Sequence, residues 1–193
     1  MSRKKLVRFA QNEVNPNVVQ AGKPIFDQIK GQWNAVQFAN DQPLVVELAC
    51  GRGEFTLGLG RQYPNQNFIG VDIKGSRIWK GSSTATAEGI ANVAFLRTQI
   101  QQLENFFAPS EISELWITFP DPFPRDGDEK RRLTSPKVLE MYKQLVKTGG
   151  IIHFKTDNTG LYEYTESVLS ARPDCQIHHN TSDFYESELR DAH

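Results

Sequence analysis

The sequence predicts an α/β fold, a mostly parallel sheet with helices on both faces. From Pro43 onward, apolar runs suited to strands alternate with stretches suited to helices. This alternation repeats five times, which is typical of βαβ units with parallel strands. In such sheets ligands bind at the carboxyl ends of the strands, so the residues that end each apolar run are the candidates for a site.

The segments expected to form each kind of element follow from residue patterns. The expected strands are residues 44–49, 67–72, 92–98, 114–120 and 150–156, and the expected helices are residues 53–62, 75–88, 99–107, 135–147 and 159–171. The helix at 135–147 has Ser135 as an N-cap, Pro136 at its first position and a stop at Gly149-Gly150. Apolar residues at three- and four-residue spacing predict one further helix over 23–39.

Length and composition predict one compact domain that needs no disulfide bonds for its stability. The chain has 193 residues, with 22 Lys and Arg against 23 Asp and Glu. A chain of this length buries about 70% of its unfolded surface, and two cysteines, Cys50 and Cys175, are too few for a disulfide framework. The near-neutral charge excludes a uniformly basic nucleic-acid binder, so any such binding would use local patches.

The N-terminus carries four cations before its first acid, with no apolar stretch after them that would mark a signal peptide. No run reaches the roughly 18 apolar residues of a membrane helix. We therefore expect a cytoplasmic protein with no membrane contact. Residues 1–22 would form a basic arm, either solvated or gripping an anionic partner, and residues 23–193 a single domain.

The segment ELACGRGEF, residues 47–55, ends the first strand and opens a helix. Ala49, Gly51 and Gly53 hold the alternating positions of a glycine-rich nucleotide loop, which lets the backbone turn sharply and approach a ligand. Asp72 ends the next strand, where an acid can bind ribose hydroxyls. Together they predict a cofactor that contains adenosine.

The identity of that cofactor depends on what the loop lacks and on Glu47. The loop has neither the third glycine of G-x-G-x-x-G nor a Gly-Lys-Ser/Thr, which disfavours dinucleotides and P-loop nucleotides. A carboxylate two residues before the loop would repel a pyrophosphate. It suits S-adenosyl-L-methionine, which has no phosphate and carries an ammonium and a sulfonium.

The segment FPDPFPRDGDEKRRL, residues 119–133, follows the fourth strand. Its prolines stiffen the loop, which would hold Asp121 and Phe123 at the end of that strand. A ring that packs on a planar acceptor, beside a carboxylate that offsets charge on an alkylated nitrogen, suits an N-methyltransferase. Arg125 and residues 130–132 add cations diluted by three acids.

The segment FKTDN, residues 154–158, ends the last expected strand. Asp157 could accept hydrogen bonds from the amino edge of a base or cap the helix that follows. The four histidines lack metal-site spacing, so no metal is expected. Cys50 has no evident base partner for a nucleophilic role.

In their order and spacing, ELACGRGEF, Asp72, FPDPFPRDGDEKRRL and FKTDN resemble the bacterial tRNA (guanine-N7-)-methyltransferases, the TrmB type. The resemblance implies a Rossmann-like class I methyltransferase fold, S-adenosylmethionine as cofactor, and methylation of guanine 46 in the tRNA variable loop.

The same resemblance implies roles for individual residues. The cofactor would be bound by Glu47, Ala49, Gly51, Gly53, Asp72, Gln99 and Asp121. Asp121 would also be the catalytic acid, with Arg125 and Asp157 binding the tRNA substrate.

The sequence departs from the family pattern in four places. Gln99 stands where an Asp is common, Phe123 replaces a Trp, and residues 126–128 replace a basic stretch. Members also continue to a Thr-x-Tyr-Glu motif near the C-terminus, whose spacing is not reproduced by Thr181, Tyr185 and Glu186. The chain is therefore expected to lack the family's C-terminal end.

Two other interpretations stay open at this point. A small-molecule or protein N-methyltransferase would share the cofactor loop but would have no use for Arg125 and the basic arm. A module that binds the cofactor without turnover would fit the shortened C-terminus and Gln99. In each case we expect a monomer, because no exposed apolar stripe is evident.

Overall fold

The computed structural model of the protein describes residues 3–184, 186 and 187. The chain divides into two compact parts, one made of residues 1–120 and 140–155 and the other of residues 121–139 and 156–193. The sheet belongs entirely to the first part. Tyr185, considered above for the C-terminal motif, lies outside the described residues.

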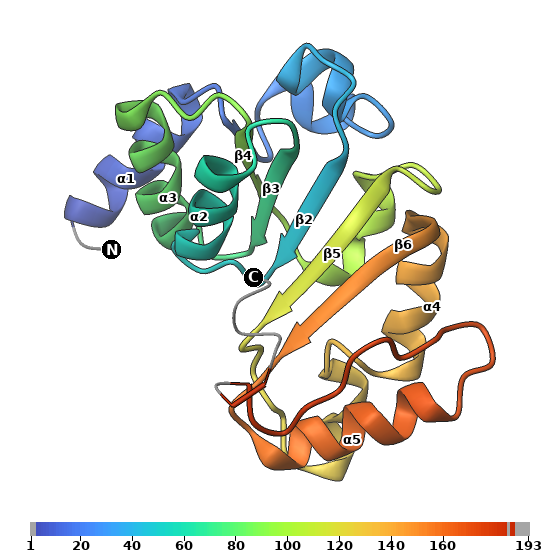
Figure 1. Ribbon diagram of the computed structural model, residues 1–193. Coiled ribbons are helices and arrows are strands. Elements are labelled where there is room, and N and C mark those ends of the chain that lie inside the picture. Colours follow the sequence, from blue (N-terminus) through green and yellow to red (C-terminus); the bar gives the residue numbers. More distant parts are fainter. Residues whose placement is uncertain (1–2, 185, 188–193) are drawn as a thin grey trace. The chain divides into compact units, whose positions relative to one another are not determined.

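The sheet confirms the predicted α/β class and its strands are all parallel. Six strands pair in the order β1-β4-β3-β2-β5-β6 (Figure 1). Their bounds are β1 Val18–Val19, β2 Leu44–Leu48, β3 Asn67–Asp72, β4 Val93–Arg97, β5 Ile112–Thr118 and β6 Val146–Lys155. From β2 the chain builds outward to β3 and β4, then returns to add β5 on the other side. The strand order therefore reverses between β2 and β5, where ligands bind in doubly wound sheets.

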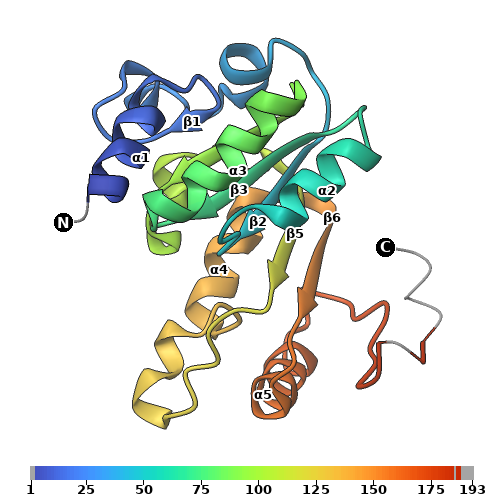
Figure 2. The same ribbon diagram turned by 90° about the vertical axis from the view of Figure 1, so that its left-hand side faces the viewer.

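Helices cover both faces of this sheet. Helices α2 (Glu54–Gln62) and α3 (Gly75–Glu88) lie on one face, and α4 (Pro136–Leu145) lies on the other (Figures 1 and 2). Strand residues on the α2 and α3 side, such as Val45 and Phe95, join a buried cluster with Leu57 of α2 and Ile78 of α3. Alternate side chains of β2 thus supply the core of each face.

The first 22 residues contain regular structure. Helix α1 (Arg3–Val14) lies beside α3, and its fully buried Asn12 donates a hydrogen bond to the Gly75 carbonyl at 2.8 Å (Figure 1). Strand β1 then pairs with β4 as an edge of the sheet.

The single helix predicted over 23–39 is wrong. The structure has a short 3-10 helix, Pro24–Asp27, and a separate π-helix, Trp33–Phe38. Between them Gly31 adopts a φ of 72°, and its N–H donates to the Glu111 carboxylate at 3.0 Å. The left-handed turn and this long-range contact override the helical spacing of the apolar residues.

The boundary between the helix after Ser135 and the last strand also differs from expectation. Helix α4 does begin at Pro136, but it ends at Leu145, and β6 runs through Gly149 and Gly150. The pairing with β5 shifts register there. A Cβ on Gly150 would lie 2.8 Å from the Ser113 carbonyl oxygen, so this glycine allows close strand approach rather than stopping a helix.

The remaining helical segments are one 3-10 turn in the first part and two elements in the second. Residues Ile100–Asn105 form a 3-10 helix where an α-helix over 99–107 was expected. The second part contains a 3-10 helix at Asp126–Arg131 and α5 at Thr159–Ser170. None of the helices in the described part of the chain combines the length and the apolar character that a membrane crossing requires.

Candidate active site

The loop after β2 has the alternating backbone that its sequence predicts. Ala49, Gly51 and Gly53 have φ values of 57°, 59° and 74°, all in the left-handed region. A side chain makes that region costly, so Ala49 is held there by its surroundings. Three left-handed residues in five positions coil the loop tightly between the end of β2 and the start of α2.

The two glycines of the loop face different surroundings. A Cβ on Gly53 would lie 2.5 Å from the ring of Phe95, whereas a Cβ on Gly51 would meet nothing nearer than 4.0 Å. Gly70 and Gly81 also leave room for the Phe95 ring, with Cβ distances of 2.9 Å and 2.6 Å. Gly53 therefore serves core packing, and Gly51 is the position at which a ligand can approach the backbone.

Replacing Gly51 and Gly53 in turn distinguishes the cost of a left-handed backbone from the cost of overpacking against Phe95. We expect Gly51→Ala to lower the free energy of unfolding by about 1–2 kcal/mol, because only its left-handed φ is penalised. Gly53→Ala adds overpacking against Phe95, about 1–3 kcal/mol more. Urea denaturation of both variants measures the difference, and equal losses would show that Phe95 does not require the glycine.

Asp72 fastens this loop to the end of β3. Asp72 is buried, with only 7% of the residue's surface exposed. One oxygen, Oδ2, accepts a hydrogen bond from the Gly51 N–H at 3.0 Å, and Oδ1 accepts one from the Lys74 N–H at 2.7 Å. A carboxylate has about four acceptor positions, so two remain for hydroxyl groups of a ligand.

Glu47 lies at the reversal point between β2 and β5 and is 4% exposed. Its Oε2 accepts hydrogen bonds from the N–H of Thr56, at 2.9 Å, and from the Thr56 hydroxyl. Its Oε1 accepts one from the Thr118 hydroxyl at 2.8 Å. The buried carboxylate thus joins the first turn of α2 to the end of β5, directly below the loop.

Burial raises the pKa of Glu47 to about 7, since desolvation outweighs the hydrogen bonds from Thr56 and Thr118. The folded protein therefore holds this proton at pH values where the unfolded chain, with a pKa near 4.5, has lost it. The associated stability is complete below pH 4.5 and is lost as the pH rises through 7.

We expect this loss to amount to about 3 kcal/mol between pH 4.5 and 8. Glu47→Gln keeps an oxygen acceptor for Thr56 and cannot ionise; its amide NH₂ stands where Oε1 accepts from Thr118, whose hydroxyl can turn to accept instead. Urea denaturation of both proteins over this pH range gives the difference between them. Parallel curves would show that Glu47 ionises without cost to the fold.

A hollow of about 300 Å³ opens beside Asp72, at the ends of β3 and β4. Its lining residues are Ala21, Phe26, Ile73, Arg97, Thr98, Gln99 and Gln102. Ile73 follows Asp72 directly, and Gln99 is exposed at the start of the 3-10 turn after β4. Phe26 lines this hollow and also packs against the Phe106 ring, with the two ring centres 4.7 Å apart.

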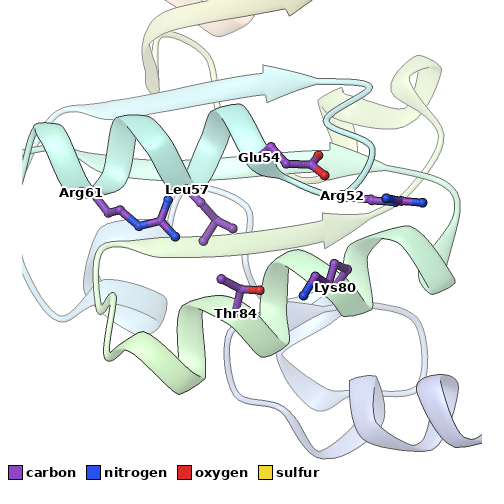
Figure 3. Close-up of a pocket in the computed structure, with 6 residues that line it drawn as sticks. All are labelled: Arg52, Glu54, Leu57, Arg61, Lys80 and Thr84. Atoms are coloured by element: carbon purple, nitrogen blue, oxygen red, sulfur yellow. The ribbon is translucent and has the colours of Figure 1, made fainter.

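A second hollow, about 240 Å³, lies between α2 and α3 (Figure 3). Leu57 and Thr84 line it together with charged side chains of both signs from Arg52, Glu54, Arg61 and Lys80. It lies along the helices rather than at the ends of the strands. We therefore place the candidate site at the loop, Asp72 and the first hollow.

The proline loop belongs to the second part of the chain from Asp121 onward. Just before it, Phe119 has a φ of 48° and its N–H donates to the Lys155 carbonyl at 2.8 Å, which extends the pairing of β5 with β6. Asp121 is exposed and follows two residues later. Phe123 has a φ of 44°, a left-handed conformation inside the loop.

The cations after the proline loop have unequal surroundings. The Arg132 Nε donates to the Phe123 carbonyl at 3.1 Å, and its guanidinium lies 4.3 Å from the centre of the Tyr164 ring. The Arg131 guanidinium lies 4.2 Å from the Phe123 ring centre and pairs with Asp128. Arg131 and Arg132 thus both contact Phe123, and Arg131 is exposed like Arg125.

The cap of α5 is Asn158, whose Oδ1 accepts a hydrogen bond from the Leu161 N–H at 2.8 Å. The interpretation of Asp157 as that cap is therefore wrong. Asp157 is exposed, one residue before the cap.

Other groups contribute no chemistry to the site. Burial raises the pKa of the Cys50 thiol well above its usual range, which suits a core residue rather than a nucleophile. In the described residues no three side chains of His, Cys, Asp or Glu gather as metal ligands would. The sequence analysis did not identify Thr56 and Thr118 as partners of Glu47. Thr118 could have been found, because it is a hydroxyl residue at the end of an apolar strand.

The fold and the coiled loop beside Asp72 define a class I S-adenosylmethionine-dependent methyltransferase fold. Among solved structures, the aminoglycoside resistance methyltransferase NpmB1 is similar, with a TM-score of 0.56 and 20% identity over 86% of this chain and 78% of that one. A family model described as "Putative methyltransferase" matches residues 41–192.

The chain belongs to the tRNA (guanine-N(7)-)-methyltransferase family. It is 46% identical to the member from Cytophaga hutchinsonii over 170 residues. This match covers 88% of this chain and 76% of the relative. It is 44% identical over 195 residues to the member from Bacteroides thetaiotaomicron, which covers 99% of this chain and 76% of the relative.

Proposed function

We propose that the protein transfers the methyl group of S-adenosylmethionine to N7 of a guanine in tRNA, at position 46 of the variable loop. The observation that carries this proposal is the coiled loop tied to Asp72 beside a hollow at the strand ends. Membership of a family whose relatives carry this name supports the substrate.

Residues of the first part suit the ribose, the adenine and the methionine moiety of the cofactor in turn. Asp72 retains acceptor positions for ribose hydroxyls, and the hollow lined by Ile73 and Gln99 suits a flat adenine ring with a polar edge. The open backbone at Gly51 admits the chain of the methionine moiety. In its ionised form Glu47 would attract the ammonium group, and that cation would in turn favour ionisation of a carboxyl whose pKa burial raises to about 7. When bound, S-adenosylmethionine supplies an electrophilic methyl group.

We propose Asp121 as the catalytic residue and also as a contact of the cofactor. Guanine N7 presents a lone pair, so the reaction needs in-line placement and compensation of the positive charge that develops on the purine. The Asp121 carboxylate, three residues after the end of β5, is proposed to provide that compensation. The ring of Phe123, a residue that Arg131 and Arg132 both contact, offers a flat surface for a base.

The substrate contacts come from exposed residues of the second part. We propose that Arg125 binds a tRNA phosphate and that Asp157, which does not cap α5, accepts hydrogen bonds from the guanine amino edge. A flipped guanine would bring N7 to the methyl donor. A tRNA substrate also supports a cytoplasmic location for the enzyme.

The test is methyl transfer from labelled S-adenosylmethionine to unmodified tRNA transcripts, run beside a panel of small amines and proteins. We expect label on tRNA and none when guanine 46 is replaced by adenine. Label on a small amine or a protein would favour another N-methyltransferase, and cofactor binding without turnover on any acceptor would favour a binding module.

A further inference from the structure

Positive charge is concentrated on α1 and α3. The two helices and Lys74, which stands just before α3, carry seven Lys and Arg residues and two acids. The whole chain, in contrast, has 22 Lys and Arg and 23 Asp and Glu. One of the two acids, Glu88, lies at the far end of α3 and pairs with Arg61 at 2.6 Å. The seven cations are Arg3, Lys4, Lys5, Arg8, Lys74, Arg77 and Lys80. We call these residues the α1–α3 basic face.

This face has a fixed shape, because α1 is fastened to α3. Besides the contact of Asn12 with Gly75, the Trp79 Nε1 donates a hydrogen bond to the Gln11 side chain at 2.5 Å (Figure 2 shows the two helices). A Cβ on Gly75 would lie 2.9 Å from the Phe9 ring, so this glycine allows α1 to approach closely.

Aromatic rings contact two cations of the basic face and the neighbouring Arg97. The Arg8 guanidinium lies 4.6 Å from the centre of the Trp79 ring, and Lys5 and Arg97 lie 5.7 Å and 5.0 Å from the centre of the Phe9 ring. Such contacts orient a cation without neutralising its charge. Lys5 and Arg8 are therefore oriented on an ordered helix rather than belonging to a solvated tail.

The basic face begins at the edge of the candidate site. Arg97 lines the hollow beside Asp72, and its Nε donates to the Ile73 carbonyl at 3.3 Å. Lys74 follows Ile73, and its N–H binds Asp72. At the other end, Lys80 lines the hollow between α2 and α3 with Arg52 of the cofactor loop (Figure 3).

We infer that the α1–α3 basic face binds the phosphate backbone of the RNA substrate and sets its position over the cofactor site. This inference rests on the proposed function. An RNA backbone fits because it is a line of regularly spaced negative charges, and phosphate contacts fix the position of a nucleic acid without reading its sequence. The net charge of −1 for the whole chain requires such a local surface.

The test compares Lys4→Ala/Arg77→Ala with Lys137→Ala/Lys147→Ala, in the full chain. Both variants lose two exposed cations, and only the first loses them from the basic face. We expect the first variant to bind tRNA about tenfold more weakly at 0.1 M salt, with a plot of log K against log salt shallower by about one to two units. Its affinity for S-adenosylmethionine should not change, and the matched variant should resemble the unaltered protein.

The outcomes separate this inference from the proposed function. Equal tRNA affinity and salt dependence in the two variants would overturn the inference, even if the unaltered protein methylates tRNA. Selective weakening in the first variant supports it, even if no tRNA accepts a methyl group. Loss of binding to vesicles rich in anionic lipid, with tRNA binding intact, would assign the face to a membrane surface and overturn the inference.

Discussion

Asp121→Ala is expected to lower the rate of methyl transfer by about 100- to 1,000-fold, the loss typical of removing one preorganised electrostatic group. The carboxylate is proposed to offset positive charge that exists on the purine only as the N–CH₃ bond forms. Its removal should therefore reduce kcat more than it weakens S-adenosylmethionine binding, for which we expect less than a tenfold change.

Single-turnover rates and cofactor titrations of the same preparations measure the two effects. Asp126→Ala is the matched control, because Asp126 is also an exposed acid and lies five positions later in the same segment. Retained turnover in Asp121→Ala would remove this residue from the mechanism. An equal loss in Asp126→Ala would point to the charge of the loop as a whole.

Asp72→Ala is expected to weaken S-adenosylmethionine binding about 100-fold. The change removes the acceptor of the Gly51 and Lys74 N–H groups, at 3.0 Å and 2.7 Å, together with the proposed ribose contacts. Losses of about 1–3 kcal/mol for each unsatisfied buried group make an effect of this size reasonable. The loop would also lose its attachment to β3.

Asp72→Asn distinguishes the two contributions. Its amide keeps one oxygen acceptor of similar shape and loses the charge, so we expect intermediate affinity. Calorimetric titration of both variants with the cofactor provides the measurement. Unchanged affinity in Asp72→Ala would mean that the cofactor does not bind beside this carboxylate.

Much of the sheet was predictable because local and long-range preferences agree there. Strand β3 and helix α3 have the expected bounds, since apolar runs and helix-compatible residues match their burial. The segment 23–39 failed because the Glu111 contact with Gly31, 80 residues away in the sequence, determines the turn. Spacing alone carries no information about such a contact.

The position of the candidate site could be predicted from the sequence, whereas the roles of several of its residues could not. The ends of β2 and β3 located Glu47 and Asp72 correctly at one edge of the sheet. The sequence could not show that Gly53 accommodates Phe95, since that requires the packing of α2 and α3 on β4. Likewise, the run of residues 130–132 looked like one basic cluster, whereas Arg132 binds a backbone carbonyl.

The most direct test of the central claim is to map the methyl group on an unmodified tRNA transcript after incubation with the protein and S-adenosylmethionine. Chain cleavage specific for N7-methylguanine locates the modified nucleotide. We predict a single cleavage at guanine 46, absent without the protein. Methylation confined to another atom or another base, or no methylation of any tRNA while the cofactor binds, would contradict the claim.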